Sequence, residues 1–195
     1  MPVASSIHNP VQQDTARYLE TAAQTGGART HLEVELAPGG GNMLHRHLTY
    51  AEHFEVVAGT LTVQVGKQLL RLAPGETATV PARCRHRFAN ETAEPVRFLV
   101  ELVPGHEGFE RALRIGYGLA ADGLTDSRGV PKRLDHLALL ADLSDMRPCG
   151  PLAALNPLLG VIARRARRRG LDRELIERYC SDVSDRMALT EDSAA

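Results

Sequence analysis

The sequence has few cysteines, almost no net charge and no long apolar run, and each shortage excludes a class of protein. Its three cysteines are odd in number and show no CxxC or zinc-knuckle spacing, so we expect reduced thiols rather than a disulfide framework. The apolar stretch 151–163 contains Pro157 and is too short to cross a bilayer. The net charge of −1 gives no general attraction to nucleic acid or to an acidic membrane.

The first residues give no reason to expect export. They contain no basic segment followed by an apolar one, which is the pattern of a secretory signal. Together with the reduced thiols, this predicts a cytoplasmic protein with no nucleic-acid partner and no stable membrane insertion. At 195 residues the chain can form one substantial core, or one domain with an appendage.

Short strands separated by turns are predicted before Pro104. Apolar and polar residues alternate over 32–36, and Gly59 marks a tight hairpin between segments 54–57 and 61–65. Further strands are expected at 68–72, 76–80, 87–89 and 96–102. Strands this short, at this regular spacing, are typical of a closed antiparallel sandwich or barrel.

Helices are predicted after Pro104. They are expected at 107–121, at 131–143 with Pro131 in the first turn, at 152–169 and at 171–189. The chain is therefore divided into an N-terminal arm (1–28), a β-barrel (29–104) and a helical C-terminal extension (105–195). We expect the extension to pack on the outside of the barrel or on a partner subunit.

Three histidines and one glutamate are the candidate site. Because side chains alternate between the two faces of a strand, His45 and His47 share one face. Glu52 shares its face with the apolar side chains of the next strand, and His86 shares its face with Phe88. All four polar side chains can therefore point into one interior. A single histidine on an apolar strand face is usually a core residue, but four side chains of matching parity favour a metal site.

The chemistry of these four side chains suits one divalent transition metal, namely Fe, Mn, Ni, Zn or Cu. The predicted ligands are His45, His47, Glu52 and His86. They leave open positions on a five- or six-coordinate ion, where water, oxygen or a bidentate substrate can bind. A closed structural zinc site would more naturally use cysteines. The remaining histidines are interpreted as solvated or structural.

Glycines and a proline surround these residues at characteristic spacings. The sequence reads Gly39-x5-His45-x-His47-x4-Glu52-x6-Gly59 and later Gly75-x5-Pro81-x4-His86-x3-Asn90. Over residues 30–104 it resembles the cupin superfamily. This resemblance implies a mainly β fold, a cupin-type jelly-roll barrel with the metal inside, here followed by an α-helical tail. In the second motif Arg83 stands where the family usually has glycine. A positive φ is costly for arginine, so we expect the turn to be rebuilt.

The resemblance leaves several functions open, because this superfamily includes enzymes, binding proteins and storage proteins. The favoured hypothesis is a metalloenzyme of dioxygenase type that acts on a small molecule in the barrel. In that hypothesis Glu52 is also catalytic, changing from a ligand to a proton acceptor. The alternatives are a metal-dependent sugar or keto-acid isomerase and a non-catalytic ligand-binding or sensing protein. Because dimerisation can cover exposed sheet edges, a homodimer is expected.

One further feature is the basic run 164–169, which follows an apolar segment. It could rest on an anionic membrane or contact nucleic acid, but no recognised binding motif accompanies it. We interpret it as the solvated, cationic end of a helix.

Overall fold

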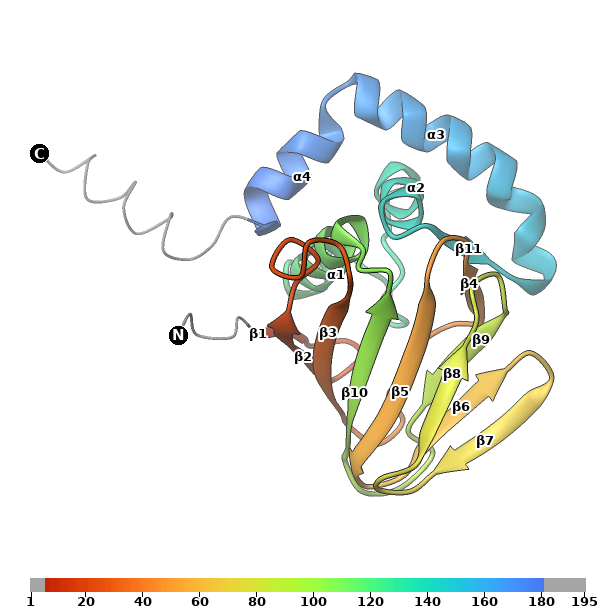
Figure 1. The fold of residues 1–195 in the computed structure, drawn as a ribbon. Coiled ribbons are helices and arrows are strands. Elements are labelled where there is room, and N and C mark those ends of the chain that lie inside the picture. The colour runs from red at the N-terminus through yellow and green to blue at the C-terminus, as the bar shows by residue number, and fades with distance from the viewer. Residues whose placement is uncertain (1–5, 181–195) are drawn as a thin grey trace, which may run out of the picture.

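The computed structural model describes residues 6–180 and consists of two antiparallel sheets with helices at one end (Figure 1). The larger sheet has the strand order β1-β2-β3-β10-β5-β8 and the smaller has β11-β4-β9-β6-β7. The strands are β1 (Ser6–Asn9), β2 (Asp14–Glu20), β3 (Thr30–Leu36), β4 (His45–His47), β5 (Ala51–Ala58), β6 (Leu61–Val65), β7 (Gln68–Leu72), β8 (Thr77–Val80), β9 (His86–Ala89), β10 (Val96–Val103) and β11 (Met146–Pro148).

The core lies between the inner faces of the two sheets. Alternate residues of β3, β5 and β10 are buried, as the period of two predicts. Phe98 on β10 is fully buried, and its ring lies edge-on to Phe88 of the opposite sheet at a centroid separation of 5.3 Å. The predicted mainly β barrel with a helical tail is confirmed.

The N-terminal segment belongs to the larger sheet rather than lying outside it. β1 pairs with β2, and β2 pairs with β3 from His31 to Leu36. Sequence alone does not reveal β1 and β2, because their inward positions include the polar Asn9 and Asp14. The segment 105–195 is not purely helical either, since β11 joins the smaller sheet by pairing with β4.

The helices cover one end of the barrel (Figure 1). They are α1 (Glu107–Ala121), α2 (Leu134–Leu143), the short 3-10 helix η1 (Gly150–Leu155), α3 (Asn156–Arg168) and α4 (Leu171–Cys180). The predicted bounds of α1 are confirmed. His106 caps α1 by accepting a hydrogen bond from the backbone N–H of Phe109.

Two of the predicted helices require correction, and part of a third lies outside the described residues. Pro131 is not in a helix: it pairs with Thr125 in an isolated bridge, and α2 begins only at Leu134. The predicted helix 152–169 is divided, because η1 precedes α3. The last helix is described up to Cys180, and the predicted residues 181–189 lie outside the described part of the chain.

A buried carboxylate fastens α1 to the barrel. Glu110 accepts hydrogen bonds from the backbone N–H of Ala22 at 2.6 Å and from the Thr30 hydroxyl. The backbone carbonyl of Glu110 in turn accepts from the Tyr18 hydroxyl at 2.9 Å. The extension is therefore held in a fixed position against β2 and β3. Within residues 6–180, no helix is long and apolar enough to cross a membrane.

Candidate metal centre

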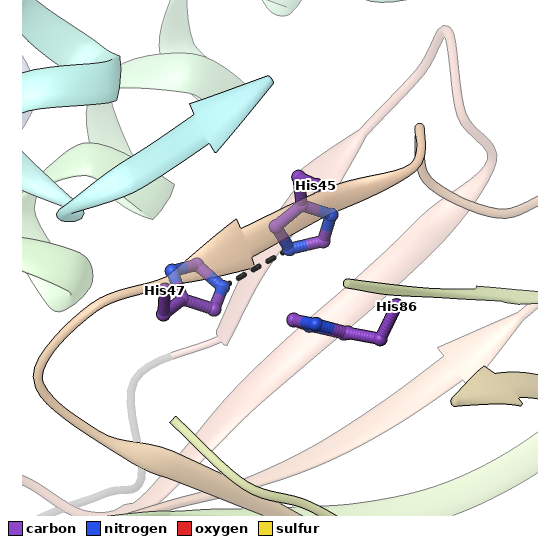
Figure 2. A group of neighbouring side chains, drawn as sticks. All are labelled: His45, His47 and His86. Carbon is purple, nitrogen blue, oxygen red and sulfur yellow. Dashed lines mark hydrogen bonds between the residues drawn. The ribbon is translucent and has the colours of Figure 1, made fainter. Parts of the chain in front are cut away.

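His45, His47 and His86 meet inside the barrel (Figure 2). His45 and His47 lie on β4, and His86 lies on β9 directly opposite His45 in the strand register. One ring nitrogen from each histidine lies within 4.8 Å of the other two, and all three side chains are buried. The structure therefore brings the three predicted histidines together.

The outer nitrogen of each of these rings is held by an oxygen atom. Nδ1 of His45 lies 2.7 Å from the carbonyl of Met43, and Nδ1 of His86 lies 3.1 Å from the carbonyl of Cys84. A carbonyl can only accept a hydrogen bond, so both Nδ1 atoms carry the proton. Nε2 of His45 then has a free lone pair directed to the interior, and Nε2 of His86 faces the Glu52 carboxylate there. Anchoring of this kind is typical of histidines that bind metals.

The contacts among the inner nitrogens fit a metal better than they fit hydrogen bonds. Nε2 of His45 lies 3.0 Å from Nε2 of His47, and the two can share a hydrogen bond only if His47 carries its proton on Nε2. Nε2 of His86 is buried, and the atom nearest to it among these side chains is a carboxylate oxygen of Glu52. A divalent transition ion would satisfy all three nitrogens at once. The donor set therefore fits such a metal.

Glu52 lies beside this group and contacts two of its members. Its Oε2 is 2.8 Å from Nε2 of His86, and its Oε1 is 3.5 Å from Nε2 of His47. Glu52 is not one of the three residues that satisfy the mutual distance of 4.8 Å, so its role as a fourth ligand stays a prediction. As predicted, Glu52 faces the interior and the adjacent His53 faces outward, where it contacts Thr79.

Burial and mutual interaction set the charges of the group. Burial and the neighbouring histidines lower the pKa of His45 to about 3, and burial also lowers the pKa of His47. Burial alone would raise the pKa of Glu52, but His86 and His47 hold it at about 2. Burial would lower the pKa of His86, yet the adjacent Glu52 carboxylate outweighs it and raises this pKa. At neutral pH the site therefore holds a carboxylate beside two neutral imidazoles.

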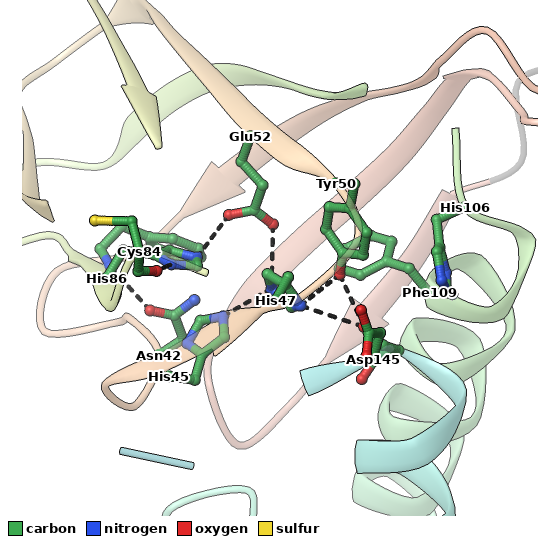
Figure 3. A network of polar contacts seen from close by, with 12 residues as sticks. Asn42, His45, His47, Tyr50, Glu52, Cys84, His86, His106, Phe109 and Asp145 are labelled. Carbon is green, nitrogen blue, oxygen red and sulfur yellow. Dashed lines mark hydrogen bonds and ion pairs between the residues drawn. The ribbon is translucent and has the colours of Figure 1, made fainter. Parts of the chain in front are cut away.

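A tyrosine and a turn of the extension complete the surroundings of His47 (Figure 3). Nδ1 of His47 lies 2.6 Å from the Tyr50 hydroxyl, which donates to the carbonyl of Ser144 at 2.9 Å. Asp145 accepts from the backbone N–H of Leu48 and from the Thr49 hydroxyl. The sequence analysis missed these residues. Tyr50 could have been found from its parity with Glu52, whereas Ser144 and Asp145 give no sequence signal.

The turn at Arg83 differs from the expectation. The expected rebuilding does not occur: Arg83 takes the left-handed conformation, with φ of 69°, and the N–H of Cys84 donates to the carbonyl of Pro81. The N–H of Arg83 donates to the carbonyl of His47 at 2.6 Å. The arginine is exposed, so its long side chain clashes with nothing in the core. The turn thus supports β4, the strand that carries His45 and His47.

A cavity of about 250 Å³ opens beside the histidines. His45, His47 and Glu52 line one part of it, and most of the rest is apolar. The apolar lining includes Phe54, Phe88, Val100, Phe109, Leu113 and Leu137. Met43 also lines the cavity, whereas Phe98 packs in the core. This is enough room for a small organic molecule beside the metal ligands.

Comparison with known proteins matches residues 32–101 to the family described as "Cupin domain". No curated protein matches the chain. Among solved structures, the TT1209 protein of Thermus thermophilus is 31% identical, with a TM-score of 0.39 over 40% of this chain and 74% of that one. A sugar phosphate isomerase from a cupin superfamily, from Silicibacter pomeroyi, is 23% identical, with a TM-score of 0.45 over 51% of this chain and 71% of that one. KdgF of Halomonas sp. is 16% identical, with a TM-score of 0.44 over 48% of this chain and 82% of that one.

Proposed function

The chain belongs to the cupin superfamily, and from this premise we propose that it is a metalloenzyme of dioxygenase type. Its substrate would be a small, largely apolar molecule that chelates the metal through two oxygens. The observation that carries the proposal is the convergence of three Nδ1-anchored histidines at an apolar cavity. When bound, the metal would supply Lewis acidity and redox chemistry at this point.

His45, His47 and His86 would hold the metal, and Glu52 would be its fourth ligand. The pKa of about 2 keeps Glu52 ionised, which suits a ligand that offsets part of the dipositive charge. The same value makes Glu52 a weak base until a metal or substrate changes its surroundings. Its predicted role as proton acceptor therefore depends on release from the histidines during the reaction.

The lining of the cavity favours this proposal over a sugar isomerase. A sugar carries several hydroxyl groups, and a site that recognises it needs matching hydrogen-bonding groups. Here the wall is mainly apolar, and phenylalanine, leucine and valine side chains contribute to it beside the histidines. A binding or sensing protein is less favoured, because binding alone does not require open positions on a metal.

Metal analysis tests the first part of the proposal. The protein as isolated should contain a transition metal in stoichiometric amount, and His47→Ala combined with His86→Ala should remove it while the fold is retained. His53→Ala is the matched control, because His53 is adjacent to Glu52 but faces outward. Undiminished metal in the double variant would exclude this site.

Oxygen uptake tests the second part. Protein loaded with iron, manganese or nickel should consume oxygen with at least one member of a panel of 1,3-diketones, flavonols and catechols. The same panel should give no uptake with the double histidine variant. If every metal-loaded sample is inactive while metal remains bound, the dioxygenase assignment fails and the binding alternative is favoured.

We also propose that two copies associate, as the open sheet edges suggest. β7 is an edge strand of the smaller sheet, and its Leu69 is 56% exposed. An exposed edge strand with an apolar side chain is commonly covered by association. Sedimentation equilibrium should give twice the chain mass, and a monomer at micromolar concentration would contradict the proposal.

A further inference from the structure

A buried carboxylate lies in the wall of the cavity, away from the histidines. Asp14 on β2 is only 5% exposed and lines the cavity. Its Oδ2 accepts a short hydrogen bond from the Tyr117 hydroxyl of α1. Its Oδ1 is buried and has no hydrogen-bond partner within the described part of the chain. One acceptor of the cavity wall is thus left without a donor.

Such an oxygen is costly for the protein. Leaving a buried acceptor without a partner destabilises the folded protein, and more so when the group is charged. Burial also raises the pKa of Asp14, which means that its charged form is poorly compensated. Alanine follows at the next inward position of the strand, Ala16, so an apolar side chain is tolerated on this face. The carboxylate therefore calls for an explanation beyond folding.

The neighbouring polar groups of the cavity do not supply the missing donor. Asn9 donates to Gln12, and its own Oδ1 accepts from the backbone N–H groups of Val11 and Gln12. Arg128 forms an ion pair with Asp126, with 3.4 Å between Nη2 and Oδ2, and the Arg128 side chain is 80% exposed. These groups are satisfied or solvated, so none of them donates to the unpartnered oxygen of Asp14.

The strand register separates Asp14 from the metal end of the cavity. Asp14 pairs with Leu36, the last residue of β3. Glu52 pairs with Leu102 of β10, and Leu102 pairs on its other side with Thr30, the first residue of β3. β2 and β5 also lie on opposite sides of the β3–β10 pair. The two carboxylates thus occupy opposite corners of one inner face. Apolar side chains such as Leu32, Val34 and Val100 line the cavity between them.

We propose that Asp14 forms a distal subsite that accepts a hydrogen bond from a hydroxyl group of the ligand. The ligand class is then a molecule with a metal-chelating head, an apolar body and a hydroxyl at the far end. Only the chelating head rests on the function proposed above. The distal contact rests on the unpartnered oxygen, the burial of Asp14 and its place in the same cavity.

A series of catechols of increasing chain length tests the subsite. Each member carries a 4-alkyl chain of four to eight carbons that ends in either CH₂OH or CH₃. Binding is measured by calorimetry on the zinc-loaded protein, because zinc has no redox chemistry and leaves the catechols intact. At the length that reaches Asp14, the hydroxyl member should bind about tenfold more tightly than its methyl counterpart, as expected for a hydrogen bond to a charged acceptor.

Variants then assign the preference to Asp14. Asp14→Leu combined with Tyr117→Phe replaces both members of the buried pair by apolar groups, a change that is often close to neutral for folding. This double variant should bind the two members of each pair equally. Tyr117→Phe alone keeps the carboxylate and should keep the preference. Leu113→Ala, a change in the apolar wall, should weaken both members alike and leave their ratio unchanged.

The matching phenylalkanols and alkylbenzenes, which lack the catechol oxygens, separate the two proposals. If the catechols bind no more tightly than the phenylalkanols and alkylbenzenes, the proposed metal contact is wrong. In that case the difference in affinity between phenylalkanols and alkylbenzenes still tests the Asp14 subsite. If catechols bind better but no chain length shows a hydroxyl preference, the subsite is wrong and the metal centre stands. A preference that survives in the Asp14 double variant would also overturn the subsite.

Discussion

The Tyr50 hydroxyl lies between Nδ1 of His47 and the carbonyl of Ser144, at 2.6 Å from the first and 2.9 Å from the second. Burial raises the pKa of Tyr50 well above its usual value, so the hydroxyl stays protonated and donates to Ser144. Because its one proton is directed to Ser144, the Tyr50 oxygen can only accept a hydrogen bond from Nδ1 of His47. The proton of His47 then lies on Nδ1. One tyrosine thus joins His47 of β4 to the C-terminal extension.

Tyr50→Phe should therefore weaken metal binding about tenfold. This is near the lower end of the loss of affinity that follows when a metal-binding histidine loses its hydrogen-bond partner. The loss is limited because Nδ1 of His47 can still reach the carbonyl of Ser144, 3.2 Å away. Competition with a chromophoric chelator measures the affinity. Tyr18→Phe is the control, since its hydroxyl also donates to a buried carbonyl but contacts no histidine of the centre. Equal metal affinity in the two variants would contradict the role of Tyr50.

Gly108 sets how closely α1 approaches the end of α2. A Cβ at Gly108 would lie 2.2 Å from the carbonyl oxygen of Leu143, the residue before Ser144. Gly108→Ala should push this segment away from His47, costing about 1–3 kcal/mol of stability and also lowering metal affinity. At Gly116 on the same helix the nearest atom is 3.7 Å away, so Gly116→Ala should instead stabilise by roughly 0.5–1 kcal/mol. Thermal unfolding and chelator competition on both variants check this, and unchanged affinity in Gly108→Ala would count against the coupling.

The local part of the site could be predicted from the sequence. The alternation of side chains along a strand placed four residues on inner faces, namely His45, His47, Glu52 and His86. This was predictable because the alternation follows from the local backbone geometry of each strand. The contact between His47 and Ser144 spans 97 residues, and no periodicity records which loop returns to which strand. Asp14 was overlooked for a related reason: a polar residue at an inward position hides the period of its strand.

Arg83 offers a test of backbone strain. A non-glycine residue in the left-handed region costs about 1–2 kcal/mol, while glycine adds roughly 0.5–1 kcal/mol of unfolded-state entropy. Arg83→Gly should therefore stabilise the protein by at most about 1.5 kcal/mol. Arg83→Val should destabilise it by more than about 1 kcal/mol, because a β-branched residue fits positive φ worst. Urea denaturation of the metal-free protein measures both, and a valine variant as stable as the glycine variant would refute the strain.

The charge of Asp14 should appear in the pH dependence of stability. Burial raises its pKa above 3.8, so the folded protein binds this proton more tightly than the unfolded chain does. The penalty for the buried charge is full above the folded pKa and is lost as the pH falls through that pKa toward 3.8. Relative to Asp14→Leu combined with Tyr117→Phe, the wild type should therefore gain stability on acidification. The gain is at most about 1.4 kcal/mol per pH unit for one proton.

Denaturant unfolding of both proteins between pH 7 and pH 4 measures this difference. The double variant is the appropriate reference, because the two proteins share the histidines and Glu52 and the titration of those groups cancels. Tyr117→Phe alone removes the donor that favours the charged form of Asp14, so it should steepen the dependence. Parallel stability curves for wild type and double variant would mean that Asp14 is well compensated in the folded protein. Its carboxylate would then have no need of a ligand hydroxyl.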